Sequence, residues 1–279
     1  HNLLIGERSA EKVKLESMIT QIADNAAQEE KRLIEKSEAV LDRLQAKLES
    51  GLSPSALNTY IQCPLDFYYT YVLGYREEDE VEETIEHSTL GSAVHEALEK
   101  LYEPHKKQGV LTPEHAAAMR PKVREQIRKA FEGLEKADSL DHGMNNLIFE
   151  VAVKFVDRFL VKEIQELKEM AERNEFVEIL ELEQNLRHTI KVSTPRGEVS
   201  VHIKGNADRI DKVGNTIRVI DYKTGKVEAK DVRLKTPYEE IRLPEKSKAL
   251  QLLMYGLMYF RNTKESYNVM AANVSMRNL

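Results

Sequence analysis

The chain has 279 residues, of which 41% are hydrophobic and 32% are charged, and its formal net charge at pH 7 is −6. This size and composition indicate a soluble protein with one sizeable core and an appendage. No apolar run is long enough to span a bilayer, no signal-peptide pattern occurs, and a single cysteine excludes an intrachain disulfide. We therefore expect no membrane association and a reducing, cytoplasmic location.

The net charge is an average over unlike segments. Between Glu77 and Glu86 there are seven acids and no base, whereas Arg187 to Arg242 holds thirteen Lys and Arg against eight Asp and Glu. A positive field suited to nucleic acid is therefore expected around the second stretch.

The chain opens with a helical pattern. Residues 7–49 contain neither Gly nor Pro, and Ser50-Gly51 follows as a helix stop. The apolar stripe lapses at Glu29 and Lys36, which favours a helix docked on a domain over an extended coiled coil. Because the chain lacks an initial Met and stops soon after a strand-like stretch, Tyr267 to Met276, we expect a piece of a larger protein. Its expected parts are a helical segment, 1–50, and a domain, 51–279.

A pair of short helices is expected between Leu52 and Gly74. Ser53 caps the first helix with Pro54 at its first position, Pro64 restarts the chain, and Gly74 closes the second helix. Cys63 reads as a small core residue. The residues expected to be buried are Leu57, Tyr60, Ile61, Phe67, Tyr68 and Tyr71.

A third helix is expected to begin at Ser88 or Thr89. Its buried stripe consists of Leu90, Val94, Leu98 and Leu101. His95 lies beside this stripe, one turn after Gly91, where the missing side chain leaves room for backbone or ligand. Taken alone, a histidine in a helix is most often structural.

Residues 114–173 are expected to be helical scaffold, and residues 176–192 to be strands that lead into a hairpin around Gly214-Asn215. A two-residue turn fixes the register of this hairpin. Asp211 is then placed opposite Arg218, as a solvent-facing ion pair.

The same register places Asp208 opposite Asp221, with Lys223 on the same face because it follows Asp221 by two residues. Two opposed carboxylates repel each other and call for a counter-charge, of which Lys223 supplies a part. Mg²⁺ prefers one or two carboxylates together with water and phosphate oxygens. The hairpin therefore predicts a divalent-metal site.

Another helix is expected over residues 248–260, after a loop at 234–245. Gln251 and Tyr255 share one face at i and i+4. The residues expected to bury the other side are Leu250, Leu253, Met254 and Leu257.

Four short patterns together resemble the PD-(D/E)XK nucleases, in particular the RecB/AddB-type nuclease domains of helicase-nuclease machines. They are G-x-x-x-H at residues 91–95, G-x-x-D-R-x-D at 205–211, I-D-Y-K-T-G at 220–225 and Q-x-x-x-Y at 251–255. The resemblance covers the chain from about Leu52 onward. It implies an α/β fold of the mixed α+β kind, with a central mixed sheet flanked by helices and a helix-rich N-terminal part.

The resemblance also implies roles for individual residues. His95, Asp208, Asp221 and the Tyr222 carbonyl would hold Mg²⁺, and Mn²⁺ would tolerate the imidazole better. Lys223 would position the attacking water and stabilise developing charge. The resemblance likewise assigns Gln251 and Tyr255 to the catalytic set, next to the hairpin.

Two further features of such nucleases bear on this chain. They often carry an acid before the hairpin, for which Glu183 is the best candidate, but Glu178 and Glu181 compete and a solvated strand face is expected for any one of them. Many also hold an iron–sulfur cluster through a cysteine at the place of Cys63 and three C-terminal ones. A cluster needs about four thiolates, so none can form from the residues present.

The resemblance implies a Mg²⁺-dependent deoxyribonuclease, expected to act as an exonuclease in DNA repair or recombination. The chain has no G-x-x-x-x-G-K-[ST] pattern, so ATP-driven unwinding must come from a helicase partner or another region of the same polypeptide. Two alternatives remain open: a non-catalytic DNA-binding or assembly module, and a nuclease acting on RNA or a small nucleotide.

Overall fold

A five-stranded sheet organises the computed structural model, which describes residues 34–75, 87–134, 140, 142–195, 197–263 and 267–279. The strand order is β1-β2-β3-β4-β5, antiparallel up to β4 and parallel between β4 and β5. This mixed sheet, flanked by helices, confirms the predicted fold class. The strands are β1 (Val110–Leu111), β2 (Val177–Thr194), β3 (Gly197–Val213), β4 (Thr216–Lys223) and β5 (Asn268–Ser275).

The β3–β4 hairpin has the predicted two-residue turn. Val213 pairs with Thr216 around Gly214, whose φ of 56° is a left-handed value that glycine adopts without strain. The predicted pair Asp211↔Arg218 is present. In the described ladder the last pair is Arg209↔Ile220, so pairing stops one step before the predicted Asp208–Asp221 pair.

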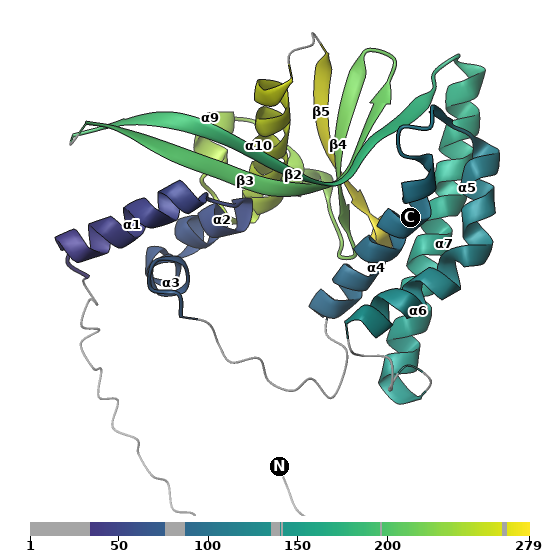
Figure 1. Ribbon diagram of the computed structural model, residues 1–279, viewed down its shortest axis with the longest axis horizontal. Coiled ribbons are helices and arrows are strands. Elements are labelled where there is room, and N and C mark those ends of the chain that lie inside the picture. Colours follow the sequence, from purple (N-terminus) through teal and green to yellow (C-terminus); the bar gives the residue numbers. More distant parts are fainter. Residues whose placement is uncertain (1–33, 76–86, 135–139, 141, 196, 264–266) are drawn as a thin grey trace, which may run out of the picture. The chain divides into compact units, whose positions relative to one another are not determined.

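The β2–β3 hairpin is much longer, and its outer half extends past β4 over α1 and α2 (Figure 1). Its register shifts between Ile179 and Glu181 and is regular from there to the Thr194↔Gly197 pair. Leu52 forms an isolated bridge with Ile203 and thereby ties the N-terminal helices to β3.

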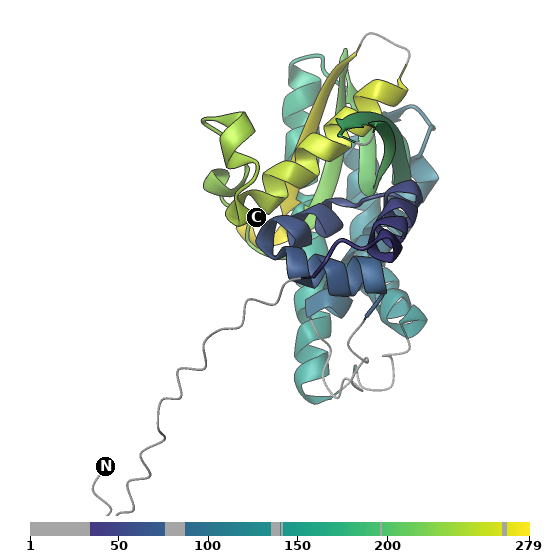
Figure 2. The same ribbon diagram turned by 90° about the vertical axis from the view of Figure 1, so that its left-hand side faces the viewer.

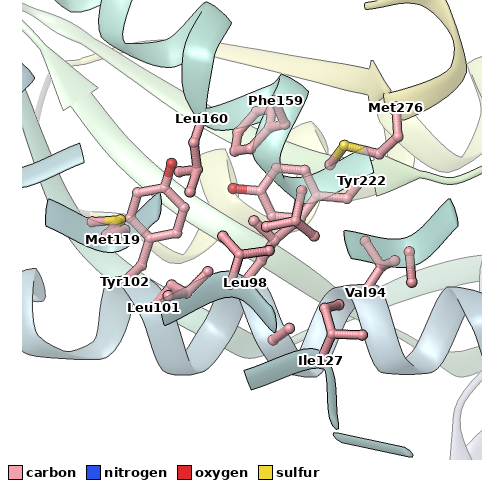
Figure 3. Close-up of a cluster of buried hydrophobic side chains, with 14 of the residues drawn as sticks. Val94, Leu98, Leu101, Tyr102, Met119, Ile127, Phe159, Leu160, Tyr222 and Met276 are labelled. Atoms are coloured by element: carbon pink, nitrogen blue, oxygen red, sulfur yellow. The ribbon is translucent and has the colours of Figure 1, made fainter. Parts of the chain in front are cut away.

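Four helices cover one face of the sheet and contain the largest core cluster. Leu90, Val94, Leu98 and Leu101 of α4 are all buried, as the stripe predicted. They pack with residues of α5, α6, α7, β2 and β4, including Tyr222 (Figure 3). The helices are α4 (His87–Tyr102), α5 (Pro113–Met119), α6 (Val123–Gly133) and α7 (Gly143–Glu172).

The opposite face is covered by α10 (Ser247–Asn262), seen in yellow in front of the sheet in Figure 2. Met254, Tyr255 and Met258 pack there on Ile217 and Val219 of β4. The prediction that Leu253 and Leu257 are buried is wrong, since they are 52% and 40% exposed. The buried stripe of α10 is rotated toward Tyr255, because that side faces the sheet.

Short elements fill the connections. The one-turn helices α8 (Ala229–Val232) and α9 (Pro237–Glu240) lie in the segment before α10. The 3-10 turns are Glu103–His105, Arg120–Lys122, Pro244–Lys246 and Met276–Asn278. Among the described helices, none is both long and apolar enough to cross a bilayer.

The N-terminal helices agree with the predicted caps. They are α1 (Glu38–Ser50), α2 (Pro54–Gln62), α3 (Pro64–Phe67) and the π-helical turn Tyr68–Leu73. The Ser53 hydroxyl accepts a hydrogen bond from the Ala56 amide, and Gly74 closes the pair at φ 78°. Tyr60 is 53% exposed, so its predicted burial is wrong, and Cys63 is half-buried.

Of the helix predicted for residues 7–49, residues 38–49 are confirmed as part of α1, which continues to Ser50. The prediction is wrong for residues 34–37, which are not helical, and residues 7–33 lie outside the described part of the chain. The described part from Ser37 to Leu279 forms one unit, in which Leu44 and Leu48 of α1 pack beside Val201 of β3.

A buried ionic network lies between the sheet and α7. Asp211 accepts hydrogen bonds from Arg209 Nε at 2.7 Å and Arg218 Nε at 2.6 Å. Arg209 Nη1 also lies 2.9 Å from Glu163 Oε1, in an orientation outside hydrogen-bonding geometry. The predicted Asp211–Arg218 pair therefore exists, but Asp211 is fully buried instead of solvent-facing, because α7 covers this face.

We expect Asp211→Ala to destabilise the protein by about 3–5 kcal/mol, because it removes the buried carboxylate that Arg209 and Arg218 share and leaves Arg209 with Glu163 alone. Urea unfolding measures this change. Asp157→Ala is the matched control, because Asp157 pairs with Arg120 in an exposed ion pair and its loss should change stability by about 1 kcal/mol or less. Equal losses in the two variants would contradict the structural role assigned to Asp211.

Candidate metal centre and active site

Three titratable side chains from three elements converge where the β2–β3 hairpin passes α4. Each of His95 in α4, Glu183 in β2 and Asp208 in β3 offers one ligand atom, and these atoms all lie within 4.8 Å of one another. At Gly91 of α4 an added Cβ would lie 3.7 Å from the Thr224 hydroxyl, which is an ordinary van der Waals contact, so this position does not require glycine for space. The chain just after β4 therefore passes close to α4.

Asp208 is held by both carboxylate oxygens. Oδ2 accepts a hydrogen bond from the Tyr222 backbone amide at 2.5 Å, and Oδ1 lies 3.3 Å from His95 Nδ1. The side chain is only 7% exposed. Asp208 therefore joins β3 to β4 and α4 at one point, although it has no ladder partner on β4.

His95 lies between two oxygen acceptors. Its Nε2 is 2.9 Å from the Tyr222 carbonyl oxygen, and its Nδ1 faces Asp208. Burial lowers the pKa of His95, but the hydrogen bond to Asp208 and the neighbouring carboxylates outweigh it, so the pKa is raised. The two ring nitrogens of His95 therefore face the Tyr222 carbonyl and the Asp208 carboxylate, two of the oxygens that would hold a cation.

Glu183 has an unusual backbone, with φ of 46° in a residue that is not glycine. Such a conformation costs on the order of 1–3 kcal/mol and is found most often at functional sites. The pairs Leu182↔Arg209 and Gln184↔Ala207 place Glu183 across from Asp208. The predicted solvated strand face is therefore wrong for Glu183, which lies half-buried in the cluster.

Burial raises the pKa of Glu183 to about 7, and Asp208 adds to the shift, while His95 and a hydrogen bond from Asn206 Nδ2 oppose it. Glu181, in contrast, pairs with Lys106 and Lys107 and takes no part in the cluster.

Asp221 lies next to the cluster and carries three donors. Gln251 Nε2 donates to Oδ1 at 2.8 Å, while Lys223 Nζ and Asn273 Nδ2 reach Oδ2 at 2.8 Å and 2.9 Å. Burial raises the pKa of Asp221, and Asp208 raises it further, against the opposing charge of Lys223. The predicted proximity of Lys223 and Asp221 is confirmed, but Asp221 is not a member of the three-residue group.

Gln251 and Tyr255 face the site from α10, as their spacing predicted. Gln251 Nε2 also donates to the Tyr255 hydroxyl at 3.0 Å. The Tyr255 ring lies against Gly205, where an added Cβ would stand 2.4 Å from Cε1 of the ring. Only glycine fits this position, so the first glycine of G-x-x-D-R-x-D makes room for the tyrosine of Q-x-x-x-Y.

The donor set fits a hard divalent cation. Carboxylates and a backbone carbonyl dominate it, with one imidazole, which suits Mg²⁺ and more readily Mn²⁺. The Oδ1 atom of Asn206, whose amide bonds Glu183, is buried without a hydrogen-bond partner among the described residues. The cluster therefore has acceptor atoms that its own donors do not satisfy.

Two contributors were not predicted from the sequence. Asn206 was missed although it precedes Asp208 by two residues and so shares its strand face. Asn273 was missed because it lies on β5, about fifty residues after Asp221, and pairs with it only through the parallel β4–β5 register.

This geometry agrees with the comparison to known families. The family model of the PD-(D/E)XK nuclease superfamily matches residues 51–277. The chain therefore belongs to the PD-(D/E)XK nuclease superfamily, as the sequence motifs indicated.

Curated relatives point to a narrower group. The chain is similar to an ATP-dependent helicase/deoxyribonuclease subunit of Clostridium perfringens strain SM101, with 31% identity over 193 residues. The protein of the same name from strain ATCC 13124 is 30% identical over 194 residues. Each match covers 64% of this chain and 16% of the relative, so the chain spans about a sixth of the relatives' length. These relatives support a nuclease-type role.

The raised pKa of Glu183 predicts a pH dependence of stability. Between its ordinary pKa of 4.5 and about 7 the folded state binds more protons than the unfolded state, so stability falls as the pH rises through this window. Glu183→Gln should remove this part of the decline. Urea unfolding at several pH values, in chelator, compares the two proteins, and parallel curves from pH 4.5 to 7.5 would contradict the assignment.

Proposed function

We propose that the chain is a divalent-metal-dependent deoxyribonuclease that hydrolyses phosphodiester bonds and acts from strand ends. The observation that carries this proposal is the convergence of His95, Glu183 and Asp208 beside the Asp221–Lys223 pair. Membership of the PD-(D/E)XK superfamily supports the reaction class, and the deoxyribonuclease names of the relatives support DNA as substrate.

The residues that would hold Mg²⁺ are His95, Asp208, Asp221 and the Tyr222 carbonyl, with Glu183 as an additional acid. When bound, such an ion polarises a phosphate oxygen and lowers the pKa of a bound water. Holding it requires His95 and Glu183 in their deprotonated forms, because only an unprotonated imidazole nitrogen and a carboxylate oxygen can bind a cation.

The other side chains orient the reacting groups. The Lys223 side chain is 29% exposed, and its Nζ, 2.8 Å from Asp221 Oδ2, would orient the attacking water and stabilise negative charge on the phosphate. Gln251 fixes the second oxygen of Asp221. Burial raises the pKa of Tyr255 to about 12, so its hydroxyl stays neutral and able to donate a hydrogen bond.

We propose further that this nuclease works with a helicase. The relatives are named as helicase/deoxyribonuclease subunits, and this chain has no phosphate-binding G-x-x-x-x-G-K-[ST] pattern of its own. In this proposal residues 51–279 form the nuclease domain of a cytoplasmic DNA-repair machine, the helicase comes from a partner or another region of the polypeptide, and residues 1–50 precede the domain.

Digestion of linear and circular single-stranded DNA in Mg²⁺ tests the function. The proposal predicts degradation of the linear form alone, no cleavage in chelator, and little cleavage of a linear RNA of the same sequence. Asp208→Asn keeps an acceptor for the Tyr222 amide but removes the charge, so cleavage should fall by at least about 100-fold. Asp157→Asn, an exposed acid on α7, is the matched control and should retain full activity.

Different results would replace parts of the proposal. Cutting of circular DNA would identify an endonuclease, and preferential cutting of RNA would identify a ribonuclease. DNA binding without cleavage in Mg²⁺ or Mn²⁺ would identify a non-catalytic module.

Lys223→Met separates charge from packing. The methionine keeps much of the side-chain stem, so we expect DNA and metal to bind while turnover falls by about 10²–10³-fold, as when one preorganised electrostatic contact is deleted. Single-turnover cleavage of labelled linear DNA at saturating Mg²⁺ gives the rate, and a binding titration in Ca²⁺ gives the affinity. Equal losses of binding and cleavage would make Lys223 a phosphate anchor instead.

A further inference from the structure

The outer half of the β2–β3 hairpin has one apolar and one polar face. Leu186, Val201 and Ile203 are buried against the α10 and α2 side. The alternate positions form three polar cross-strand pairs, in which most side chains are exposed. These pairs are Asn185↔Asn206, Arg187↔Lys204 and Thr189↔His202.

The middle pair is electrostatically unfavourable. Arg187 lies directly opposite Lys204, and like charges at paired positions destabilise a sheet. Within the described part of the chain, neither cation is ion-paired with an acid, although Lys204 Nζ donates to the Ser50 carbonyl at 3.0 Å. Burial and the charge of Lys204 also lower the pKa of Lys47 on α1. Positive charge therefore gathers at Arg187, Lys204 and Lys47.

The outer two of these pairs line a hollow with room for a ligand. Its volume is about 540 Å³, and its lining includes Arg187, Thr189, His202 and Lys204. The lining also includes one acid, Glu49, whose carboxylate accepts a hydrogen bond from Gln45 Nε2. Farther out, Lys191 is neutralised by Glu198 at 2.9 Å, so the excess of positive charge ends before the hairpin tip.

The polar face is continuous with the metal centre. Asn206 lies two residues from both Lys204 and Asp208, and its amide donates to Glu183 of the centre. At about 3.4 Å per residue, Lys204 lies roughly 14 Å along β3 from Asp208.

We propose that these three pairs, the hairpin track, bind the phosphodiester backbone of the nucleic-acid strand whose scissile bond lies in the metal centre. This inference rests on the proposed nuclease function. Arg187 and Lys204 contact phosphate oxygens, and the amide and hydroxyl groups at either end of the track supply hydrogen bonds. A phosphate between the two cations removes the repulsion that the free protein contains.

The test compares two double variants. The track variant is Arg187→Ala/Lys204→Ala, and the control is Lys129→Ala/Lys168→Ala, which removes the same charge from exposed positions on α6 and α7. A labelled 20-nucleotide single strand is titrated in Ca²⁺ at several salt concentrations. The slope of log K against log salt is negative, and each lost phosphate contact lowers its magnitude by about 0.7. We therefore expect the magnitude to fall by about 1.4 in the track variant. The control should keep the wild-type slope.

Arg187→Ala alone guards against a folding effect, because it leaves the Lys204–Ser50 contact intact, and it should remove about half of the slope change. Bis(p-nitrophenyl) phosphate is a phosphodiester too small to reach the track. Its cleavage in Mn²⁺ should therefore be unchanged in both double variants.

The outcomes separate the two proposals. If the track variant binds the strand as tightly and with the same slope as the control while the wild type cleaves DNA, the track is refuted and the nuclease function stands. If the wild type neither binds nor cleaves DNA, both are refuted. If the small phosphodiester is also cleaved more slowly by the track variant alone, the cations act on the metal centre itself and the track is refuted.

Discussion

The site depends on the contacts that the Asp208 carboxylate makes. One of its oxygens accepts the backbone amide of Tyr222 and the other faces His95, so a single side chain joins two strands and a helix. Glu183 and Asp221 are partly shielded from solvent and lie near the negative charge of Asp208. Burial and this charge raise the pKa of both side chains. The fold tolerates this repulsion because Lys223, two amides and the His95 ring supply partial compensation. A divalent cation would compensate it fully.

Residues of β3 beside Asp208 belong to a second, buried cluster. Asp208 points to the metal centre, while Arg209 and Asp211 join the buried network with Glu163 and Arg218 under α7. The D-R-x-D pattern therefore contributes Asp208 to the metal centre and Arg209 and Asp211 to the buried ionic network. Gly205, four residues before the arginine, connects this strand to α10 by admitting the ring of Tyr255. The motifs are thus linked by packing as well as by chemistry.

Local rules predicted much of this structure. The Gly214-Asn215 turn fixed the Asp211–Arg218 pairing, the spacing of Gln251 and Tyr255 placed both toward the site, and the apolar stripe of α4 was correct. What local rules missed depends on contacts between distant segments. The burial of Asp211 requires α7, and the role of Asn273 requires the parallel pairing of β5 with β4. The left-handed backbone at Glu183 has no signal in the residue type, so nothing in the strand pattern distinguished it from Glu178 or Glu181.

The most direct test of the account is to locate a bound cation. Crystals soaked in Mn²⁺ and measured at the manganese absorption edge give an anomalous difference map that marks the ion independently of any assumed ligand. The account predicts a peak within coordination distance of Asp208, the Tyr222 carbonyl and His95, and its loss in crystals of Asp208→Asn. A fully occupied peak elsewhere, or no peak among these groups at saturating Mn²⁺, would contradict it.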